Sequence, residues 1–220
     1  MRDLDLRSFL AIYGGPFGGW RGPAPGAWAM TMVALTLLGG GWSALAVLPM
    51  LWHARTRLFG KLLAAAIVAQ ASLVWSIKRA VGRTRPWVAL GLAPPLGAPH
   101  DGSFPSGHAS GSFCVAAFLA IALPAAWPSS PRAARLVGAV GVLIAALIAL
   151  SRVYLGAHFP SDAIAGAALG GMVGATAGSM YARRAGPRRR SCAQQAQKQK
   201  ETTRWNAAPK KAKRRPPCAF

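Results

Sequence analysis

The chain has 220 residues, of which 53% are hydrophobic, and its mean hydropathy of +0.30 is high for a water-soluble protein. Its net charge is +21, but half of its 26 lysines and arginines lie between Arg183 and the C-terminus, so residues 1–182 are mostly apolar. This composition favours a membrane protein. Only five acidic residues and three cysteines are present, which disfavours both a carboxylate-rich metal site and a disulfide framework.

Five uncharged apolar runs follow in chain order, each near the length that crosses a bilayer core. They are residues 27–52, 62–77, 109–127, 136–150 and 163–181. We therefore expect an all-α, polytopic transmembrane helical bundle with about five spans. In the first run, Gly39, Gly40 and Gly41 could separate an interfacial helix from a shorter span, so four or six crossings also agree with the sequence.

The flanking segments complete the expected organisation. Asp3 and Asp5 replace the basic leader of a cleavable signal, so residues 1–26 are expected to form an N-terminal interfacial segment. Residues 27–182 form the membrane domain, and residues 183–220 a disordered polybasic tail. In the last run, glycines recur every four residues from Gly166 to Gly178 and permit close helix packing. We expect that packing within the chain, with a homodimer contact as the alternative.

Charge in the loops predicts the orientation. Basic residues in 53–61, in 132–135 and in the tail indicate that these segments face the cytoplasm. Residues 78–108 and 151–162 then lie together on the extracytoplasmic face. Because these two segments carry their own lysine and arginines against the charge rule, we interpret them as a binding site for an anion.

The first of three motifs is Lys78-x6-Arg85-Pro86. Lys78 ends an apolar run, and Pro86 forces Arg85 into an extended loop at the membrane surface. Lysine supplies a point charge and arginine a planar fork, and both suit phosphate oxygens. Arg79 and Arg83 are expected only to reach the lipid headgroups.

The second motif, residues 105–108, reads Pro-Ser-Gly-His and immediately precedes an apolar run. Ser106 is a candidate N-cap, and the free amides beside Ser106 and Gly107 are suited to bind phosphate. His108, on the first turn, is placed to act on a group next to the bound oxygen. Asp101, a short distance upstream, is expected to be an exposed loop carboxylate.

The third motif contains Ser151, Arg152, His158 and Asp162. Pro160 predicts that the last helix begins there, which puts Asp162 in its first turn. We expect Asp162 to accept the proton on one ring nitrogen of His158, leaving the other nitrogen free to attack phosphorus. Arg152 would add a third cation for the phosphoryl oxygens.

Together these motifs resemble the signature of the type 2 phosphatidic acid phosphatases, a family related to bacterial acid phosphatases and vanadium haloperoxidases. The resemblance covers residues 78–162 and fills every marker position. It implies that His158 is the nucleophile of a phosphohistidine intermediate, that Asp162 holds it, and that His108 protonates the leaving group. It also implies that Lys78, Arg85 and Arg152, with the amides near Ser106 and Gly107, hold the phosphoryl group without a metal ion or other cofactor.

The sequence therefore predicts an integral phosphatase of a bacterial plasma membrane, acting on phosphatidic acid, phosphatidylglycerol phosphate or undecaprenyl diphosphate at the extracytoplasmic face. A vanadium-dependent haloperoxidase is one alternative, since the same residues can hold vanadate. A non-catalytic membrane protein with a binding tail is another. The tail lacks the interleaved aromatic residues of a nucleic-acid site, and we expect it to bind anionic lipids from the cytoplasmic side.

Overall fold

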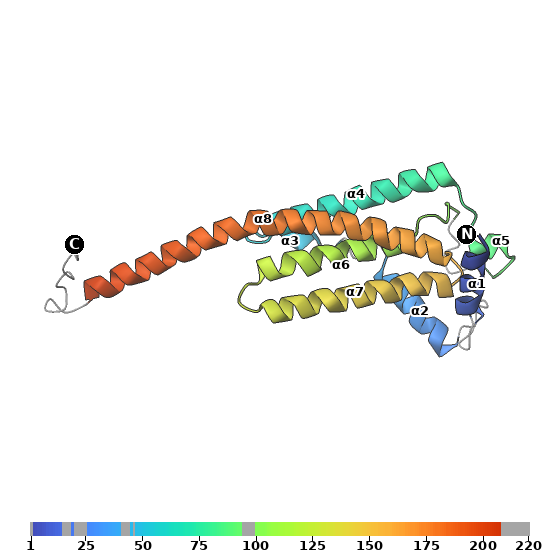
Figure 1. Cartoon of the computed structure of the whole chain (residues 1–220), viewed down its shortest axis with the longest axis horizontal. Coiled ribbons are helices and arrows are strands. Elements are labelled where there is room, and N and C mark those ends of the chain that lie inside the picture. The colour runs from blue at the N-terminus through green and yellow to red at the C-terminus, as the bar shows by residue number, and fades with distance from the viewer. Residues whose placement is uncertain are drawn as a thin grey trace. The chain divides into compact units, whose positions relative to one another are not determined.

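The computed structural model of the chain describes residues 2–14, 19, 26–40, 45, 47–93 and 100–207 (Figure 1). Its helices are α1 (Arg2–Tyr13), α2 (Ala27–Leu38), α3 (Leu48–Trp52), α4 (Arg57–Val81), α5 (Pro86–Ala89), α6 (Gly107–Ala126), α7 (Pro131–Tyr154) and α8 (Pro160–Ala207). Every regular element in these residues is a helix, which confirms the expected all-α class. The chain divides into two units, Met1–Ala182 and Arg183–Phe220.

Four helical stretches in the described residues are long and apolar enough to cross a membrane. They are Arg57–Ala89, Gly107–Ala126, Pro131–Tyr154 and Pro160–Ala185, and they match the last four predicted runs, except that Trp127 lies just after the second stretch. The first run differs from the prediction of one span, because α2 ends at Leu38 and α3 begins only at Leu48. With 12 residues, α2 is only about 18 Å long, too short for the apolar core of a bilayer.

The first run breaks at a glycine that lies against two other helices. Gly39 caps α2, and a side chain at this position would collide with Ile148 of α7 and approach His108 of α6. This close contact requires glycine at the end of α2. Gly40, the next residue, lines the cavity described below, whereas Gly41 lies outside the described residues.

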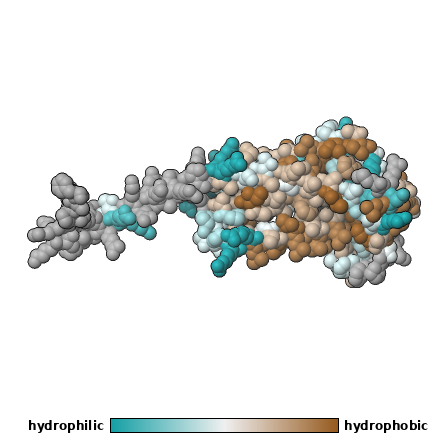
Figure 2. Space-filling view, viewed as in Figure 1, coloured by the Kyte–Doolittle hydropathy of each residue, from teal (hydrophilic) through white to brown (hydrophobic). Residues whose placement is uncertain are grey.

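Helices α6 and α7 form an antiparallel hairpin around which the first unit is arranged (Figure 1). Helix α4 packs against α6, and α2 packs against α7. Phe59 at the start of α4 contacts both Phe118 of α6 and Tyr181 of α8, with ring centroids 4.9 and 5.1 Å apart. Apolar side chains dominate the flank of this bundle (Figure 2) and include exposed Leu73, Leu143 and Met172, as expected for a surface in contact with lipid.

The glycine face of α8 lies directly on α6. A Cβ atom added at Gly166, Gly170, Gly174 or Gly178 would meet the backbone of α6 about once per turn, from Ser106 to Phe118. The periodic glycines therefore serve contact within the chain, as predicted, and let two helix backbones approach closely. This contact brings the start of α8 next to the start of α6.

In the second unit, α8 continues as far as Ala207, so residues 183–207 are helical and differ from the disordered segment expected there. Alanine, glutamine, lysine and arginine make up most of this stretch and are good helix formers, which outweighs the low hydrophobicity that suggested disorder. Residues 208–220, the rest of the predicted tail, lie outside the described part of the chain.

Replacing Gly170 or Gly174 by alanine should reduce the stability of the bundle by about 1–3 kcal/mol, because the new methyl group would overlap the carbonyl oxygen of Ser110 or Cys114. The folded fraction during SDS titration in mixed micelles measures this effect. Gly171→Ala is the matched control, since nothing lies within 4 Å of a Cβ atom there. Equal stability of Gly170→Ala and Gly171→Ala would contradict the close contact.

Candidate functional site

The three sequence motifs meet at one end of the bundle. Lys78 lies in the last turn of α4, Arg85 caps α5, and Arg152 lies in the last turn of α7. His108 lies in the first turn of α6, and His158 two residues before α8 begins. These five side chains line a single cavity of about 600 Å³. The expectation that the motifs assemble into one site therefore agrees with the structure.

The cavity has a polar end and an apolar flank. Its polar end is formed by charged and histidine side chains, its flank by side chains of α2 and α4. The lining residues are Val33, Thr36, Leu37, Gly40, Gln70, Ala71, Val74, Trp75, Lys78, Arg85, Asp101, Gly107, His108, Arg152 and His158. A cavity of this kind can hold an anionic group and an attached apolar chain at the same time.

His158 is buried, and both of its ring nitrogens have partners. Nδ1 lies 2.7 Å from the backbone oxygen of Ser103, which can only accept a hydrogen bond, so Nδ1 carries the proton. Nε2 then holds the lone pair, and Nη1 of Arg85 lies 3.2 Å from it. The backbone carbonyl of Ser103 therefore fixes the tautomer of His158, with the proton on Nδ1 and the lone pair on Nε2.

This geometry changes the role expected for Asp162. Its Oδ2 is 3.8 Å from Nδ1 of His158, beyond hydrogen-bond distance, so the carboxylate does not accept the ring proton directly as the sequence suggested. Asp162 acts instead through Ser103, whose hydroxyl donates to Oδ2 while its carbonyl accepts from His158. The backbone amide of Phe159 also donates to Oδ2, at 2.9 Å.

Arg85 and Lys78 share a carboxylate partner. Nη2 of Arg85 donates to Oδ1 of Asp101 at 2.5 Å, and Nζ of Lys78 donates to Oδ2 at 2.7 Å. Arg85 also donates to the backbone oxygens of Asp101 and Ala157, both at 2.9 Å, which orients its guanidinium in the cavity wall. Asp101 is 55% exposed, as expected of a loop residue, yet it belongs to the site.

The start of α6 supplies backbone donors. Ser106 is the N-cap, as predicted, and its hydroxyl accepts from the amide of Ala109 at 3.5 Å. The amide of Ser106 itself donates to the backbone oxygen of Asp162, so it is engaged in joining α6 to α8. The first helical amides, those of Gly107 and His108, have no acceptor within the helix and are the donors suited to an anion.

Arg152 is buried and joins α7 to α2 through a bond of 2.7 Å from Nη1 to the hydroxyl of Thr36. Among the residues that the structure describes, Nε of Arg152 has no hydrogen-bond partner. A buried donor without a partner is costly, and an anion in the cavity would satisfy it. The third predicted cation is thus available to a ligand.

Burial and hydrogen bonding give His158 and Asp101, which both lie outside the helices, different charges at pH 7. Burial lowers the pKa of His158 to about 4, aided by Arg152 and Arg85 and opposed by Asp162, so the imidazole is neutral at pH 7. Burial tends to raise the pKa of Asp101, but hydrogen bonds from Lys78 and Arg85 outweigh it and lower the pKa to about 2. A neutral imidazole therefore lies in the same site as an ionised carboxylate that is paired with Lys78 and Arg85.

Sequence reasoning missed three residues of the site. Arg83, expected only to reach headgroups, donates from Nη1 to Oδ1 of Asp162 at 2.6 Å. Ser103 and Asp101 have the roles described above. All three lie in or beside the first two motifs, but their partners are 16 to 79 residues away in sequence. Local spacing carries no signal for such contacts.

Comparison with known proteins gives one family match. The model of the PAP2 superfamily matches residues 57–185. Phosphatidylglycerophosphatase B of Bacillus subtilis (strain 168) is 36% identical over 94 residues, which are 43% of this chain and 44% of the relative. Decaprenylphosphoryl-5-phosphoribose phosphatase of Mycobacterium tuberculosis (strain ATCC 25618 / H37Rv) is 36% identical over 127 residues, 58% of this chain and 63% of the relative. The chain thus spans less than two thirds of either relative.

A solved structure supports the fold. The transmembrane PAP2-type phosphatidylglycerolphosphate phosphatase from Bacillus subtilis superimposes with a TM-score of 0.67 and 24% sequence identity. The superposition covers 81% of this chain and 85% of that protein. At this identity the similarity concerns the arrangement of helices, and it agrees with a membrane-spanning helical bundle.

The buried, neutral state of His158 predicts a pH-dependent stability. The unfolded chain binds a proton near the ordinary pKa of 6.5, whereas the folded protein binds it only near 4, so stability should fall as pH decreases between these values. SDS titrations from pH 7 to pH 4 should show a smaller loss for His158→Asn than for the unchanged protein. His53→Asn, at an exposed histidine, should keep the full loss. An unchanged slope in His158→Asn would contradict this assignment.

Proposed function

Because the chain belongs to the PAP2 superfamily, we propose that it is an integral membrane phosphatase that hydrolyses a phosphate ester or diphosphate bond of a lipid. The observation that carries this proposal is Nε2 of His158, which accepts a hydrogen bond from Arg85 in a cavity that Lys78, Arg152 and His108 also line. A bound phosphoryl group would have to take this donor from Nε2 before the lone pair could attack phosphorus. The relatives named as phosphatases of phosphatidylglycerophosphate and of a decaprenyl-linked phosphate support the choice of a lipid substrate.

The proposed reaction has two steps. Nε2 of His158 attacks phosphorus, a P–N bond forms, and the bond between phosphorus and the leaving oxygen breaks as His108 donates a proton to that oxygen. His108 then removes a proton from a water molecule, whose oxygen attacks phosphorus and breaks the P–N bond. The backbone carbonyl of Ser103 accepts a hydrogen bond from Nδ1–H in both steps, so the ring keeps its proton on Nδ1 and returns to its starting tautomer.

Charge stabilisation in both steps comes from fixed donors. Lys78, Arg85 and Arg152 would surround the equatorial oxygens of the phosphoryl group, together with the amides of Gly107 and His108. Phosphoryl transfer requires mainly such positioning and electrostatic stabilisation, and these groups supply it without a metal ion. Asp101 already takes one donor from Lys78 and one from Arg85, so a bound phosphoryl group competes with its carboxylate.

The apolar flank suits the lipid chain of the substrate. Val33 and Leu37 of α2 face the cavity together with Ala71, Val74 and Trp75 of α4. Trp75 and Leu37 are also 58% and 61% exposed, so the flank continues to the outer surface of the bundle. A lipid could therefore place its phosphate at the polar end while its chain stays in an apolar environment.

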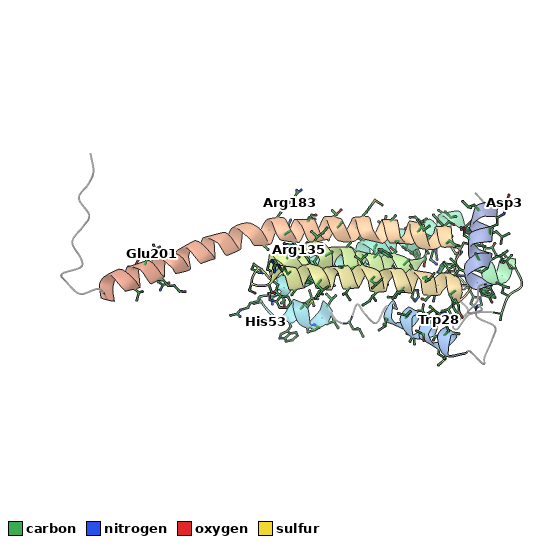
Figure 3. The ribbon with its side chains drawn as sticks, turned by 60° about the horizontal axis from the view of Figure 1, so that its bottom comes forward. Asp3, Trp28, His53, Arg135, Arg183 and Glu201 are labelled. Carbon is green, nitrogen blue, oxygen red and sulfur yellow. The ribbon has the colours of Figure 1, made fainter. Side chains whose placement is uncertain are left out.

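The orientation in the membrane is also a proposal. His53 and Arg135 mark one end of the first unit and Asp3 the other (Figure 3). The end away from the site carries Arg55, Arg57, Lys61, Arg132 and Arg135, and we take it as cytoplasmic by the positive-inside rule, because the cations at the other end belong to the site. The site would then lie on the extracytoplasmic face of a bacterial plasma membrane. The basic C-terminal unit would then lie in the cytoplasm, where it is suited to anionic lipids.

Replacing His158 by alanine should reduce phosphate release by at least about a thousandfold, because the imidazole that forms the proposed covalent intermediate is lost. Purified protein would be assayed with phosphatidic acid, phosphatidylglycerol phosphate and undecaprenyl diphosphate, each with and without EDTA. Activity should be insensitive to EDTA and inhibited by orthovanadate. His53→Ala is the matched control and should retain activity. Full turnover by His158→Ala in correctly inserted protein would refute the mechanism.

Asp101→Asn should bind inorganic phosphate about three- to tenfold more tightly, on the order of 1 kcal/mol, because a partly exposed carboxylate no longer competes for Lys78 and Arg85. The inhibition constant of phosphate against lipid hydrolysis measures this change. Asp3→Asn removes the same charge from an exposed position and should leave the constant unchanged. Weaker binding by Asp101→Asn would instead mean that Asp101 organises the two cations.

A further inference from the structure

Helix α1 reaches the site through one carboxylate. Oδ2 of Asp5 accepts hydrogen bonds of 2.6 Å from Nη2 of Arg83 and from the hydroxyl of Ser161, and Oδ1 accepts the amide of Ser161 at 3.0 Å. Ser161 lies in the first turn of α8, so Asp5 supplies an acceptor for a helix-start amide that α8 cannot satisfy itself. The side chain of Asp5 is only 11% exposed.

Arg83 connects this carboxylate to Asp162. Its Nη1 donates to Oδ1 of Asp162 at 2.6 Å and to the hydroxyl of Ser161 at 2.7 Å, while Nη2 holds Asp5. The guanidinium carbon also lies 4.3 Å from the ring centroid of Phe159. The planar guanidinium presents one nitrogen to each of the two carboxylates, whereas the single Nζ of a lysine would have to lie close to both at once.

Asp162 transmits this restraint to the nucleophile. Its two oxygens are bound by Arg83 on one side and by Ser103 and the Phe159 amide on the other. The backbone oxygen of Ser103 accepts a hydrogen bond from Nδ1 of His158, and Phe159 directly follows His158 in the chain. A shift of Asp162 would therefore move both the group that sets the tautomer and the backbone that carries the imidazole.

A second contact from α1 acts on the same turn. Phe9 is fully buried, and its ring lies 5.5 Å from that of Phe159 in an edge-to-face arrangement. It also packs with Val153 and Ala163, which flank the turn between α7 and α8. Helix α1 thus holds this turn by one polar and one apolar contact, and Figure 1 shows it crossing that end of the bundle.

We propose that Asp5 and Arg83 are positioning residues of the reaction, through which α1 holds the His158–Asp162 turn in its reactive geometry. This rests on the proposed phosphatase function. Neither side chain lines the cavity, so substrate binding should not depend on them directly. Their loss should therefore lower kcat and leave KM and the inhibition by inorganic phosphate nearly unchanged.

The test compares Asp5→Asn, Arg83→Gln, Arg83→Lys and the double variant Asp5→Asn/Arg83→Gln. We expect kcat to fall about three- to tenfold in Asp5→Asn and about a hundredfold in Arg83→Gln, since small displacements of reacting groups are costly. Arg83→Lys should recover part of the loss, because it keeps the charge near Asp162. The double variant should resemble Arg83→Gln, because the two residues act in series.

Asp3→Asn is the matched control, since Asp3 is an exposed carboxylate on the same helix. The proposal is overturned if Asp5→Asn and Arg83→Gln have the kcat of Asp3→Asn, or if their losses appear in KM. If a variant inserted poorly into the membrane, inorganic phosphate would bind to a smaller fraction of the purified protein, which distinguishes poor insertion from a lower kcat. Lack of turnover by the unchanged protein would refute the proposed function instead.

If the unchanged protein shows no turnover, a measurement that does not need activity still tests whether Arg83 positions His158. The ¹⁵N shifts of the His158 imidazole, assigned by comparison with His158→Gln, report which nitrogen carries the proton. The unchanged protein and Asp3→Asn should show a single Nδ1–H tautomer, and Arg83→Gln a mixture. Identical spectra for Arg83→Gln and Asp3→Asn would overturn the positioning role regardless of activity.

Discussion

The buried carboxylate of Asp162 is the interaction on which the site depends. A charge taken out of water is strongly destabilising unless it is paired and fully hydrogen-bonded. Asp162 meets this condition with donors from Arg83, Ser103 and Phe159, while its backbone oxygen accepts the amide of Ser106. Satisfying one side chain thus brings the end of α4, the segment before α6 and the start of α8 to the same place.

The glycine face of α8 and the chemistry at its start are consequences of the same contact. Gly166 and Gly170 allow α8 to lie against the backbone of α6, which places the Asp162 turn beside the first turn of α6. His108 and His158 therefore line one cavity although 50 positions separate them in sequence. Because glycines let the backbones of α6 and α8 lie in contact, this packing brings His108 and His158 close together at the start of the two helices.

Sequence patterns predicted the four long apolar helices and the motif residues that line the cavity, because hydrophobic runs and helix-start residues act locally. They did not predict the role of Arg83, whose partners Asp5 and Asp162 are 78 and 79 residues away. They also assigned the ring proton of His158 to Asp162, since a backbone carbonyl such as that of Ser103 has no sequence signature. For the first apolar run, the sequence left one span and a break at the glycines from Gly39 to Gly41 as alternatives, and the structure has the break, with α2 ending at Leu38. The contact of Gly39 with Ile148 of another helix has no signal in the local sequence.

We propose that Nε2 of His158 forms a covalent bond to phosphorus. This is tested by rapid quenching in alkali of protein mixed with a lipid substrate labelled with ³²P, followed by peptide mapping. We expect an alkali-stable, acid-labile phosphate on the peptide containing His158, formed and lost at rates compatible with turnover. Label on a different residue, or the absence of a phosphorylated protein while turnover proceeds, would contradict it.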